Sequence, residues 1–480
     1  MKRFKVIVIL ALVLVMATVG MASAQSPAYQ TPFTTSVTYQ NVGISNATIV
    51  FSFYPEMNAS PITVNKTLAA GAGTSLYLGS IDTLPANFTG SAVLSSDANI
   101  VATLVQIPTS TTVKNRPLSN GFSSGATDVR IASVLKNKFN TTSRFSVQNA
   151  DSGAIDLTVK FYDAAAPTAA PIVVTQANIP IGAAKAYDLG NMAQLPASFN
   201  GSAVLSAVKS GTSTPANIVA SAMELSTNGD AASAFEGASS SAPTVYMASA
   251  LCNAFGGAFN SYYAVQNTGD AATTVTVTYS NGKNNAKSIE PGAKSSFNAC
   301  EVAANDGFSG SATITTSPST NIVVLGKVSG GGISAAFLGE SAGSEKLALP
   351  YVRWTNQAAY DAGGTQRTYI AIQNIGGSAV TGVEVQFLNK NGEVVGSQVL
   401  GSIANGAKLN SNASTATPAS GHTATELTEF GTPAGNPGGG YGGAVVVKGP
   451  AGSQLVAVAR VTSLVNGATV GEDYNAIPIQ

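Results

Sequence analysis

Apolar and polar residues alternate in short stretches along this chain of 480 residues, and Gly, Asn or Pro separates one stretch from the next. In residues 273–279, TTVTVTY, apolar side chains fall on every second position, which is the period of a half-buried β-strand. Residues 263–266, YAVQ, alternate in the same way. Between the two runs, residues 267–269, NTG, tolerate positive φ, so the whole stretch predicts a β-hairpin.

This hairpin pattern occurs four times, at intervals of about 110 residues. In each copy a Gln-Asn pair ends the first run and a second run follows; the Asn residues are Asn41, Asn149, Asn267 and Asn374. A second marker comes later in each copy and consists of an aromatic residue, one further residue, a Gly and then small or β-branched residues. Its copies are FTGSAVL at 88–94, FNGSAVL at 199–205, FSGSATI at 308–314 and YGGAVVV at 441–447. Two markers in a constant order indicate four related units, each of ordinary domain size.

The strands of one unit are clearest in the second copy. Between residues 129 and 225, short runs rich in β-branched and aromatic residues are separated by Gly, Pro or Asn, without a convincing helical period. They divide into about seven strands, a number typical of an immunoglobulin-like sandwich of two antiparallel sheets. We therefore predict an all-β protein of four tandem immunoglobulin-like β-sandwich domains in an elongated array.

The predicted organisation begins with a leader and ends with a short tail. Residues 1–24 combine basic residues, an apolar run and a small-residue site before Gln25, as in a secretory signal peptide. Since no later run has the apolar length of a membrane span, we expect a secreted, extracellular protein at the cell surface. The expected domains are 25–111, 112–225 with its linker, 226–328 with its linker, and 329–466 with its linker and an inserted loop at 410–440, followed by a tail at 467–480.

The low and scattered charge argues against one class of function, nucleic-acid binding. Charged residues make up 10% of the chain and are scattered along it, against about a quarter in ordinary proteins. Without a basic patch, the sequence has no electrostatic footprint for nucleic-acid binding. The polar residues are mainly Ser, Thr, Asn and Gly, and such neutral surfaces suit contact with other copies of the chain or with surface polysaccharide.

The two cysteines, Cys252 and Cys300, both lie in the third unit. An even number of cysteines in an exported chain favours a disulfide. A redox or metal pair would need CxxC spacing or a nearby histidine, and the sequence offers neither.

Candidate catalytic chemistry is scarce. The only histidine, His422, lies in the 410–440 insertion and is interpreted as a solvated loop residue, so a His-rich metal site is excluded by counting. The carboxylates indicate no glycosidase pair, and no phosphate loop or EF-hand spacing occurs. Trp354, the only tryptophan, is interpreted as a partly buried sandwich residue rather than a binding platform. We predict no catalytic, cofactor or metal site, and a protein that is not an enzyme.

The repeated markers have two interpretations each. In the first, the Asn adopts a left-handed turn conformation and its amide bonds the neighbouring backbone; in the second, four exposed amides form a ligand-binding edge. We favour the first. The marker aromatics are likewise interpreted as core plugs rather than as sugar-stacking rings: Phe88, Phe199, Phe308 and Tyr441. A Phe in each segment between units is expected to pack against the previous unit: Phe122, Phe235 and Phe337.

The Gln-Asn hairpin, the F-x-G-S-A strand and the Ala/Ser/Thr/Val-rich composition resemble tandem immunoglobulin-like repeats of bacterial cell-surface proteins. Adhesin stalks, surface-layer subunits and extracellular filament proteins have this architecture. The resemblance covers nearly all of the chain after the leader and transfers no functional residue. It implies an exported structural protein; the alternative is an extracellular carbohydrate- or ligand-binding module that acts through the 410–440 loop.

The two ends of the chain suggest a mode of assembly. Units two to four have a strand-like run before the Gln-Asn hairpin, whereas the first unit has only residues 25–35, with two prolines. In the tail, Ala476, Ile477 and Ile479 are apolar enough to pair as a strand, although the intervening proline confines it to an edge. We hypothesise that this tail, or the N-terminal segment acting in the reverse direction, completes a sheet of a neighbouring copy and builds a head-to-tail filament. The alternative is that the tail folds back on the fourth unit.

Overall fold

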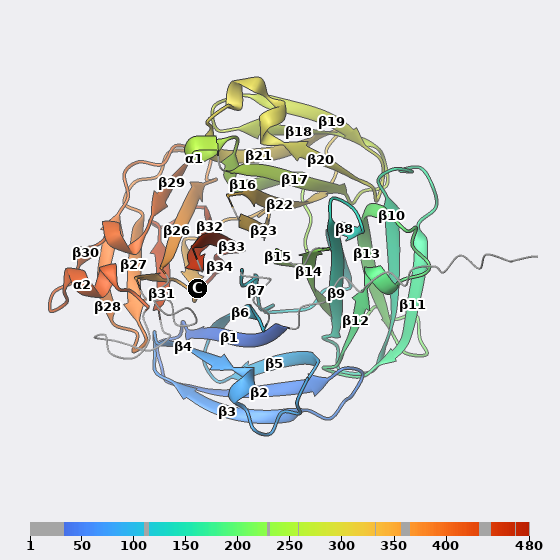
Figure 1. Ribbon diagram of the computed structural model, residues 1–480, viewed down its shortest axis with the longest axis horizontal. Helices are drawn as coiled ribbons and strands as arrows, with labels where there is room; N and C mark the ends of the chain where they lie inside the picture. The colour runs from blue at the N-terminus through green and yellow to red at the C-terminus, as the bar shows by residue number, and fades with distance from the viewer. Residues whose placement is uncertain are drawn as a thin grey trace, which may run out of the picture.

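Four pairs of antiparallel sheets surround a central axis and form a closed ring (Figure 1). This computed structural model describes residues 33–109, 115–227, 231–257, 259–331, 333–356, 365–431, 443–465 and 467–479. Each unit has an inner sheet near the axis and an outer sheet at the periphery (Figure 1). The prediction of an all-β protein with paired antiparallel sheets is confirmed, and the arrangement is consistent with β-sandwiches.

The first two units have the following sheets. In unit one the inner sheet is β4 (Gly73–Tyr77), β1 (Phe33–Asn41), β6 (Ile100–Pro108) and β7 (Leu118–Asn120), and the outer sheet is β3 (Ile62–Leu68), β2 (Ala47–Pro55) and β5 (Gly90–Ser96). In unit two the inner sheet is β12 (Ala184–Asp188), β9 (Thr141–Asn149), β14 (Ile218–Ser226) and β15 (Ala232–Glu236), and the outer sheet is β11 (Ile172–Ile179), β10 (Ile155–Asp163), β13 (Phe199–Lys209) and β8 (Asp128–Lys136). Short 3₁₀ turns, η1 (Leu78–Ser80) and η2 (Leu189–Asn191), follow β4 and β12.

Unit three repeats unit two. Its inner sheet is β20 (Lys294–Asn298), β17 (Asn260–Asn267), β22 (Ile322–Gly330) and β23 (Ile333–Leu338), and its outer sheet is β16 (Thr244–Leu251), β21 (Ser309–Ser317), β18 (Thr273–Tyr279) and β19 (Asn284–Ile289). The short helical elements are α1 (Ala254–Gly257), η3 (Ala299–Glu301) and η4 (Ala303–Asn305).

Unit four is the most elaborate. Its inner sheet is β25 (Trp354–Thr355), β26 (Gln366–Asn374), β32 (Leu455–Val465) and β33 (Ala468–Asn475), with β29 (Lys408–Ser411) also paired to β26. Its outer sheet is β30 (Thr417–Pro418), β28 (Val394–Val399), β27 (Glu384–Asn389), β31 (Gly443–Lys448), β24 (Lys346–Leu349) and β34 (Ile477–Pro478). The 3₁₀ turn η5 (Ala413–Thr415) and the helix α2 (Ala424–Thr428) lie in the predicted insertion.

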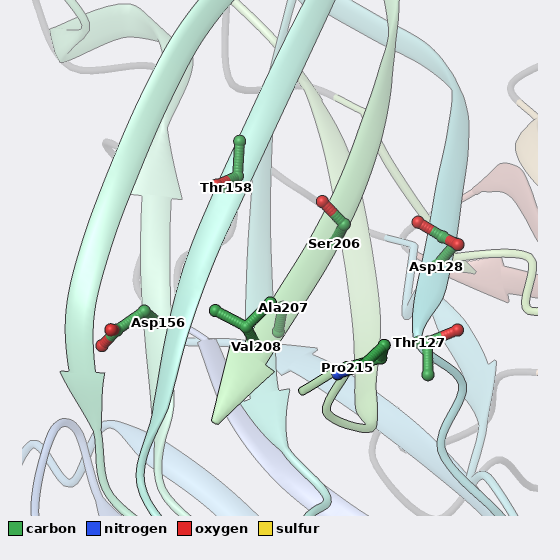
Figure 2. Close-up of a pocket in the computed structure, with 8 residues that line it drawn as sticks. All are labelled: Thr127, Asp128, Asp156, Thr158, Ser206, Ala207, Val208 and Pro215. Atoms are coloured by element: carbon green, nitrogen blue, oxygen red, sulfur yellow. The ribbon is translucent and has the colours of Figure 1, made fainter. Parts of the chain in front are cut away.

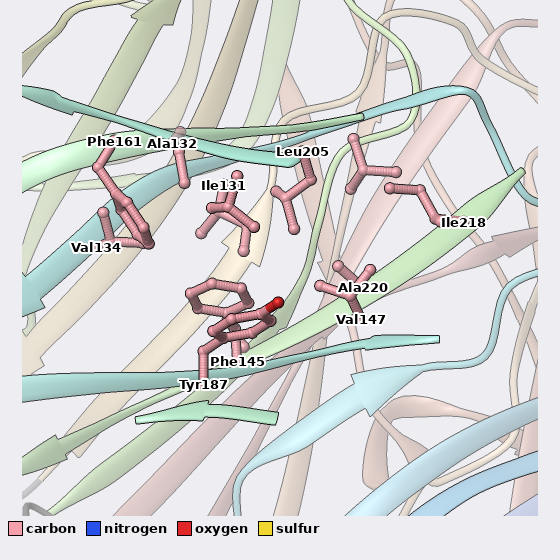
Figure 3. Packing of buried hydrophobic residues seen from close by; sticks show 14 of the residues in the cluster. Ile131, Ala132, Val134, Phe145, Val147, Phe161, Tyr187, Leu205, Ile218 and Ala220 are labelled. Atoms are coloured by element: carbon pink, nitrogen blue, oxygen red, sulfur yellow. The ribbon is translucent and has the colours of Figure 1, made fainter. Parts of the chain in front are cut away.

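Each core lies between the two sheets of a unit and is built from the alternate apolar positions of the strands. In unit two, Phe145 of the inner sheet stacks on Tyr187 with ring centroids 5.0 Å apart and tilts against Phe161 of the outer sheet at 6.2 Å (Figure 3). The marker aromatic Phe199 meets Phe161 edge-on at 6.3 Å and is 1% exposed. The same edge-on contact recurs for Phe88 with Phe53 and for Phe308 with Tyr279. The marker aromatics at 88, 199 and 308 are therefore core plugs, whereas Tyr441 lies outside the described residues.

The prediction of an elongated array is wrong, because the segments between units are strands rather than linkers. β7, β15, β23 and β33 each pair with the last long strand of their own unit, and together they converge on the ring axis as a central hub (Figure 1). Phe235 and Phe337 are 1% and 2% exposed, so their predicted packing is confirmed. Phe122 is only half-buried. In this fold each unit ends after its hub strand, later than the sequence boundaries at 111, 225 and 328.

The seams between units repeat one contact. The marker Ser of one unit donates a hydrogen bond to the carbonyl of a Gly-Ala turn in the next: Ser91 to Gly182 at 2.7 Å, Ser202 to Gly292 at 2.8 Å, and Ser311 to Gly406 at 2.6 Å. The turn glycines have φ near +73° to +76°, which glycine adopts without steric cost. Between units four and one, Gly392 contacts the turn at Gly71. The Gly-Ala turn is thus contacted at all four seams, although unit four has Ala444 in place of the marker Ser. Because this head-to-tail arrangement closes, the units are related by rotation about the hub.

Candidate binding loops

The side chains of the four marker Asn residues are buried and form hydrogen bonds with the backbone of their own unit. In unit two, the Asn149 side chain donates to the carbonyls of Gly153 at 2.7 Å and Ile179 at 2.9 Å, and accepts from the Asp151 N–H at 2.8 Å. Asn41, Asn267 and Asn374 make the equivalent bonds. All four are at most 1% exposed. The favoured interpretation is confirmed in its hydrogen bonds but wrong about the left-handed backbone, since each Asn ends an extended strand. The predicted hairpin is also wrong, because the strands before and after each Asn belong to the two different sheets of a unit.

The predicted disulfide is present between Cys252 and Cys300, with the Cα atoms 5.1 Å apart. Cys252 follows the first strand of unit three, and Cys300 lies in η3, after β20. The bond therefore fixes the base of the loop that begins at Asn253.

That loop and its counterpart in unit two carry the most exposed aromatic side chains of the described residues. Phe139 is 71% exposed and Phe255 is 66% exposed. Each lies two residues after an Asn, in the connection between the first and second strands of its unit. We call residues 137–140 and 253–257 the aromatic loops.

The backbone of both aromatic loops is unusual. Asn137, Phe139 and Asn253 have φ of 47°, 53° and 43°, and Phe255 has φ of 56°. Positive φ is uncommon for residues other than Gly and costs about 1 kcal/mol or more for a large side chain. An apolar ring held in solvent on such a backbone gains nothing for the fold itself. Because strained backbone of this kind often lies at functional sites, the aromatic loops are candidate interaction sites.

In each aromatic loop, a neighbouring side chain contacts the exposed ring. The Lys138 ammonium lies 5.7 Å from the centroid of the Phe139 ring, and Phe259 meets Phe255 edge-on at 6.1 Å. The rotational relation between units places the loops at equivalent corners, and α1 lies at the corner between units three and four (Figure 1). Sequence analysis missed these residues, although the repeated N-x-F of 137–139 and 253–255 was available as a signal.

Unit four presents a different group at the equivalent corner. Trp354 is half-buried, as predicted, and meets Tyr369 edge-on at 5.5 Å, with the Arg367 guanidinium 4.9 Å from its ring centroid. Tyr369 is 42% exposed, and its counterpart in unit three, Tyr262, is 36% exposed.

The 410–440 insertion supports this corner. Its described part, up to residue 431, packs on unit four: Leu427 and Phe430 are each 2% exposed, and the Trp354 N–H donates to the Phe430 carbonyl at 2.8 Å. His422 is not a free loop residue, because its Nδ1 lies 3.1 Å from Glu426 Oε1. Glu426 in turn caps α2 with Thr423. Residues 432–442 lie outside the described part.

A small hollow of about 210 Å³ lies on the outer sheet of unit two (Figure 2). Two carboxylates, Asp128 and Asp156, stand on opposite sides of it (Figure 2). Asp156 accepts hydrogen bonds from the Asn178 N–H and from the Ser210 hydroxyl, which lower its pKa. Its oxygens are engaged in local structure, so this hollow offers no acid–base pair. Among the described residues, no group of three or more His, Cys, Asp or Glu side chains could hold a metal ion.

Buried ionisable groups lie at the seams and in the hub instead. Between units two and three, Lys327 pairs with Glu224 at 2.7 Å, and Ser133 donates to the same carboxylate at 2.9 Å. Lys294 also contacts Ser133, and its burial, with repulsion from Lys327, lowers its pKa to about 7. In the hub, Glu472 accepts from the Arg116 N–H, Glu236 from the Asn120 N–H, and Glu340 from the Asn475 amide. These groups join neighbouring units.

The predicted assembly segment is a strand of its own unit. The Ala476 N–H donates to the Ala457 carbonyl at 2.9 Å, Ile477 pairs with Ala348, and the Ile479 N–H donates to the Lys346 carbonyl at 3.0 Å. Ala476 is 5% exposed. The tail therefore folds back on unit four, as the alternative expected, and is not free for donation to another copy.

Comparison with models of known protein families and with curated proteins gave no match. Within the described part of the chain, no helix has the length and apolar character needed to cross a membrane.

Proposed function

We propose that this chain is an exported, non-enzymatic cell-surface protein that binds surface polysaccharide through its aromatic loops. The observation that carries the proposal is the exposure of Phe139 and Phe255, at 71% and 66%, on strained loops at equivalent corners of the ring. An exposed aromatic ring offers a flat apolar face with a polar surrounding, and such a face suits the apolar side of a sugar ring.

The ring architecture supports a role as a rigid scaffold. The hub strands and the repeated seam contacts fix neighbouring loops relative to one another. Two loops held at a fixed spacing bind one polymer more tightly than either loop alone. Export is proposed from the leader-like residues 1–24, and the disulfide is compatible with an oxidising compartment.

We further propose that the units are a variant of the immunoglobulin-like sandwich. In unit two, the pairs β9–β12 and β10–β13 correspond to the second–fifth and third–sixth strand pairs of that fold. The outer strands differ, since β8 pairs with β13 and β14 pairs with β9. The first and seventh strands have therefore exchanged sheets relative to the immunoglobulin order.

The test is sedimentation of the purified protein with insoluble chitin, cellulose and peptidoglycan. We expect the wild type to bind at least one of them, and the double variant Phe139→Ser/Phe255→Ser to bind at least tenfold more weakly, about 1.4 kcal/mol. The matched control is Ile44→Ser, because Ile44 is fully exposed in the connection between β1 and β2 of unit one, away from the aromatic loops. Equal binding by the wild type and the double variant, or no binding to any of the three polymers, would overturn the proposal.

A further inference from the structure

Units two to four each begin with a strand that has no counterpart in the described part of unit one. β8, β16 and β24 pair with β13, β21 and β31, the strands that carry the F-x-G-S-A marker or its YGGAV variant. The matching strand of unit one is β5, which among the described residues pairs only with β2. Within the described part of the chain, the second edge of β5 is therefore unpaired.

The unpaired edge leaves core side chains of unit one exposed. Leu205, Ile314 and Val447, which occupy the same marker position, are each 0% exposed, whereas Leu94 is only half-buried. Ala92 is half-buried in the same way. The marker sequences of units one and two differ only at Thr89 and Asn200, so the difference in burial comes from the neighbouring strand and not from the marker.

In units two and three a single strand fills the place that corresponds to the unpaired side of β5. In unit two, β8 lies between β13 and the segment after the hub strand, where Arg130 and Ala238 exchange backbone hydrogen bonds of 2.9 and 2.8 Å. The same bridge joins Tyr246 to Glu340 in unit three. In unit one, Phe122 takes the place of Ala238, because the preceding Gly121 N–H donates to Ala102 just as Gly237 N–H donates to Ala220. We call the space between β5 and Phe122 the slot.

The chain's own sequence before β1 does not match this slot. Alignment of Asn41 with Asn149 places residues 20–28, GMASAQSPA, in register with β8. The buried β8 residues Val129, Ile131 and Val134 then correspond to Met, Ser and Ser, and a Pro takes the place of Leu135. Serine supplies no apolar burial, and Pro removes a ladder hydrogen bond. The predicted leader cleavage before Gln25 also falls within this stretch.

The surface of unit two that faces the slot is more polar than the corresponding surface of unit three. At the seam between units two and three, Ala264 and Leu325 of unit three belong to the apolar core that includes β8. The equivalent positions facing the slot are Ser146 and Ser221, which are half-buried. An occupant therefore needs apolar side chains toward β5 and small or hydroxyl side chains toward unit two.

We propose that the slot accepts an extended segment of another polypeptide, roughly seven to nine residues long, with apolar residues at alternate positions and no proline. The segment completes the outer sheet of unit one and pairs with the backbone of β5. The hydrogen bonds from Asp97 N–H to Thr48 and from Glu56 N–H to Thr89 fix the alternation of β5. By that alternation the Ala92 and Leu94 N–H groups point into the slot.

The experiment uses the purified full-length protein and a peptide with the sequence of residues 127–137, TDVRIASVLKN, as the probe. This peptide contains the strand that completes the nearly identical marker of unit two. We expect saturable one-to-one binding by fluorescence anisotropy, and at least tenfold slower hydrogen exchange at the Ala92 and Leu94 amides on binding. The control peptide carries Asp in place of the residues matching Val129 and Ile131, and we expect it neither to bind nor to slow exchange.

Three results would overturn the proposal. The first is no binding of the probe at millimolar concentration. The second is protection of Ala92 and Leu94 in the free monomer, which would place the chain's own N-terminal segment in the slot. The third is the same protection in a concentration-dependent dimer, which would make a second copy the occupant. The Phe139→Ser/Phe255→Ser variant should bind the probe like the wild type, so failure of the polysaccharide proposal would leave this one standing.

Discussion

At the residue scale, the side-chain amides of the four marker Asn residues are buried and bonded to the backbone where a strand ends. Asn149 satisfies two backbone carbonyls and one backbone N–H at the end of β9. Because water cannot replace these bonds at a residue that is 1% exposed, Asn149→Ala should lower the free energy of unfolding by about 3 kcal/mol. Chemical denaturation followed by circular dichroism measures the change. The control Asn191→Ala, at an exposed position, should stay within about 0.5 kcal/mol of the wild type.

The hub gives a second prediction at this scale, a dependence of stability on pH. Burial raises the pKa of Glu472 from 4.5 to about 8, although the Arg116 N–H and the Arg116 charge partly offset the effect. Between these two values the unfolded chain releases the proton and the folded chain retains it, so the contribution of this group to stability is lost as pH rises from 4.5 to 8. The substitution Glu472→Gln removes the titrating group, so the variant does not lose this stability as the pH rises. Relative to the wild type, the variant should gain roughly 1.4 kcal/mol for each pH unit at most, and the gain should level off above pH 8.

Thermal unfolding at pH 5, 6, 7 and 8 measures this trend. A difference between variant and wild type that stays constant or shrinks with pH would contradict it. The control Glu345→Gln changes an exposed carboxylate and should give a difference that does not vary over the same range.

At the element scale, the sequence predicted what local rules determine. Alternation located the strands, and the Asn-Gly and Gly-Ala turns at Gly282, Gly392 and Gly182 do have positive φ. The alternation of apolar residues did not predict that Phe235 and Phe337 belong to strands. Short segments rich in Gly and Ser have no clear period, and these segments form strands only because the hub offers them partners. The aromatic loops were missed because the repeated N-x-F of 137–139 and 253–255 locates a Phe in each loop but does not say whether its side chain is exposed or buried.

The insertion shows how a composition rule fails at this scale. Residues 410–440 contain few large apolar residues, and that composition is typical of an unpacked, protease-sensitive loop. Two of those few, Leu427 and Phe430, are buried in unit four. We therefore expect Leu427→Ala to cost about 2–3 kcal/mol and to speed cleavage within 410–431 by limited proteolysis. Thr425→Ala, exposed on the same short helix, should change neither stability nor cleavage.

At the scale of the whole molecule, the ring closes where unit four meets unit one, at Gly392 and Gly71. Four repeats were predictable from the sequence, but their closure into a ring was not, because the contacts between units involve no local pattern. Gly392 and Gly282 are equivalent hairpin glycines with φ of 86° and 80°, so a substitution strains both backbones alike. A Cβ at Gly392 would come within 2.5 Å of the Ala70 carbonyl oxygen, whereas a Cβ at Gly282 meets no atom within 4 Å. Comparing substitutions at these two glycines therefore separates the effect of the contact between units from the backbone strain that a side chain causes in the turn.

Gly392→Val should lower the melting temperature more than Gly282→Val, and only Gly392→Val should loosen the ring. For the wild type without its leader, compact-domain scaling gives a radius of gyration of about 22 Å, well below that of four units in a line. Small-angle scattering should return a value near this for the wild type and for Gly282→Val, and a larger one for Gly392→Val. If both variants melt at the same temperature and keep the wild-type radius, the contact between Gly392 and Gly71 does not close the ring. The hub, through Glu472, Asn475 and their partners, would then hold it closed alone.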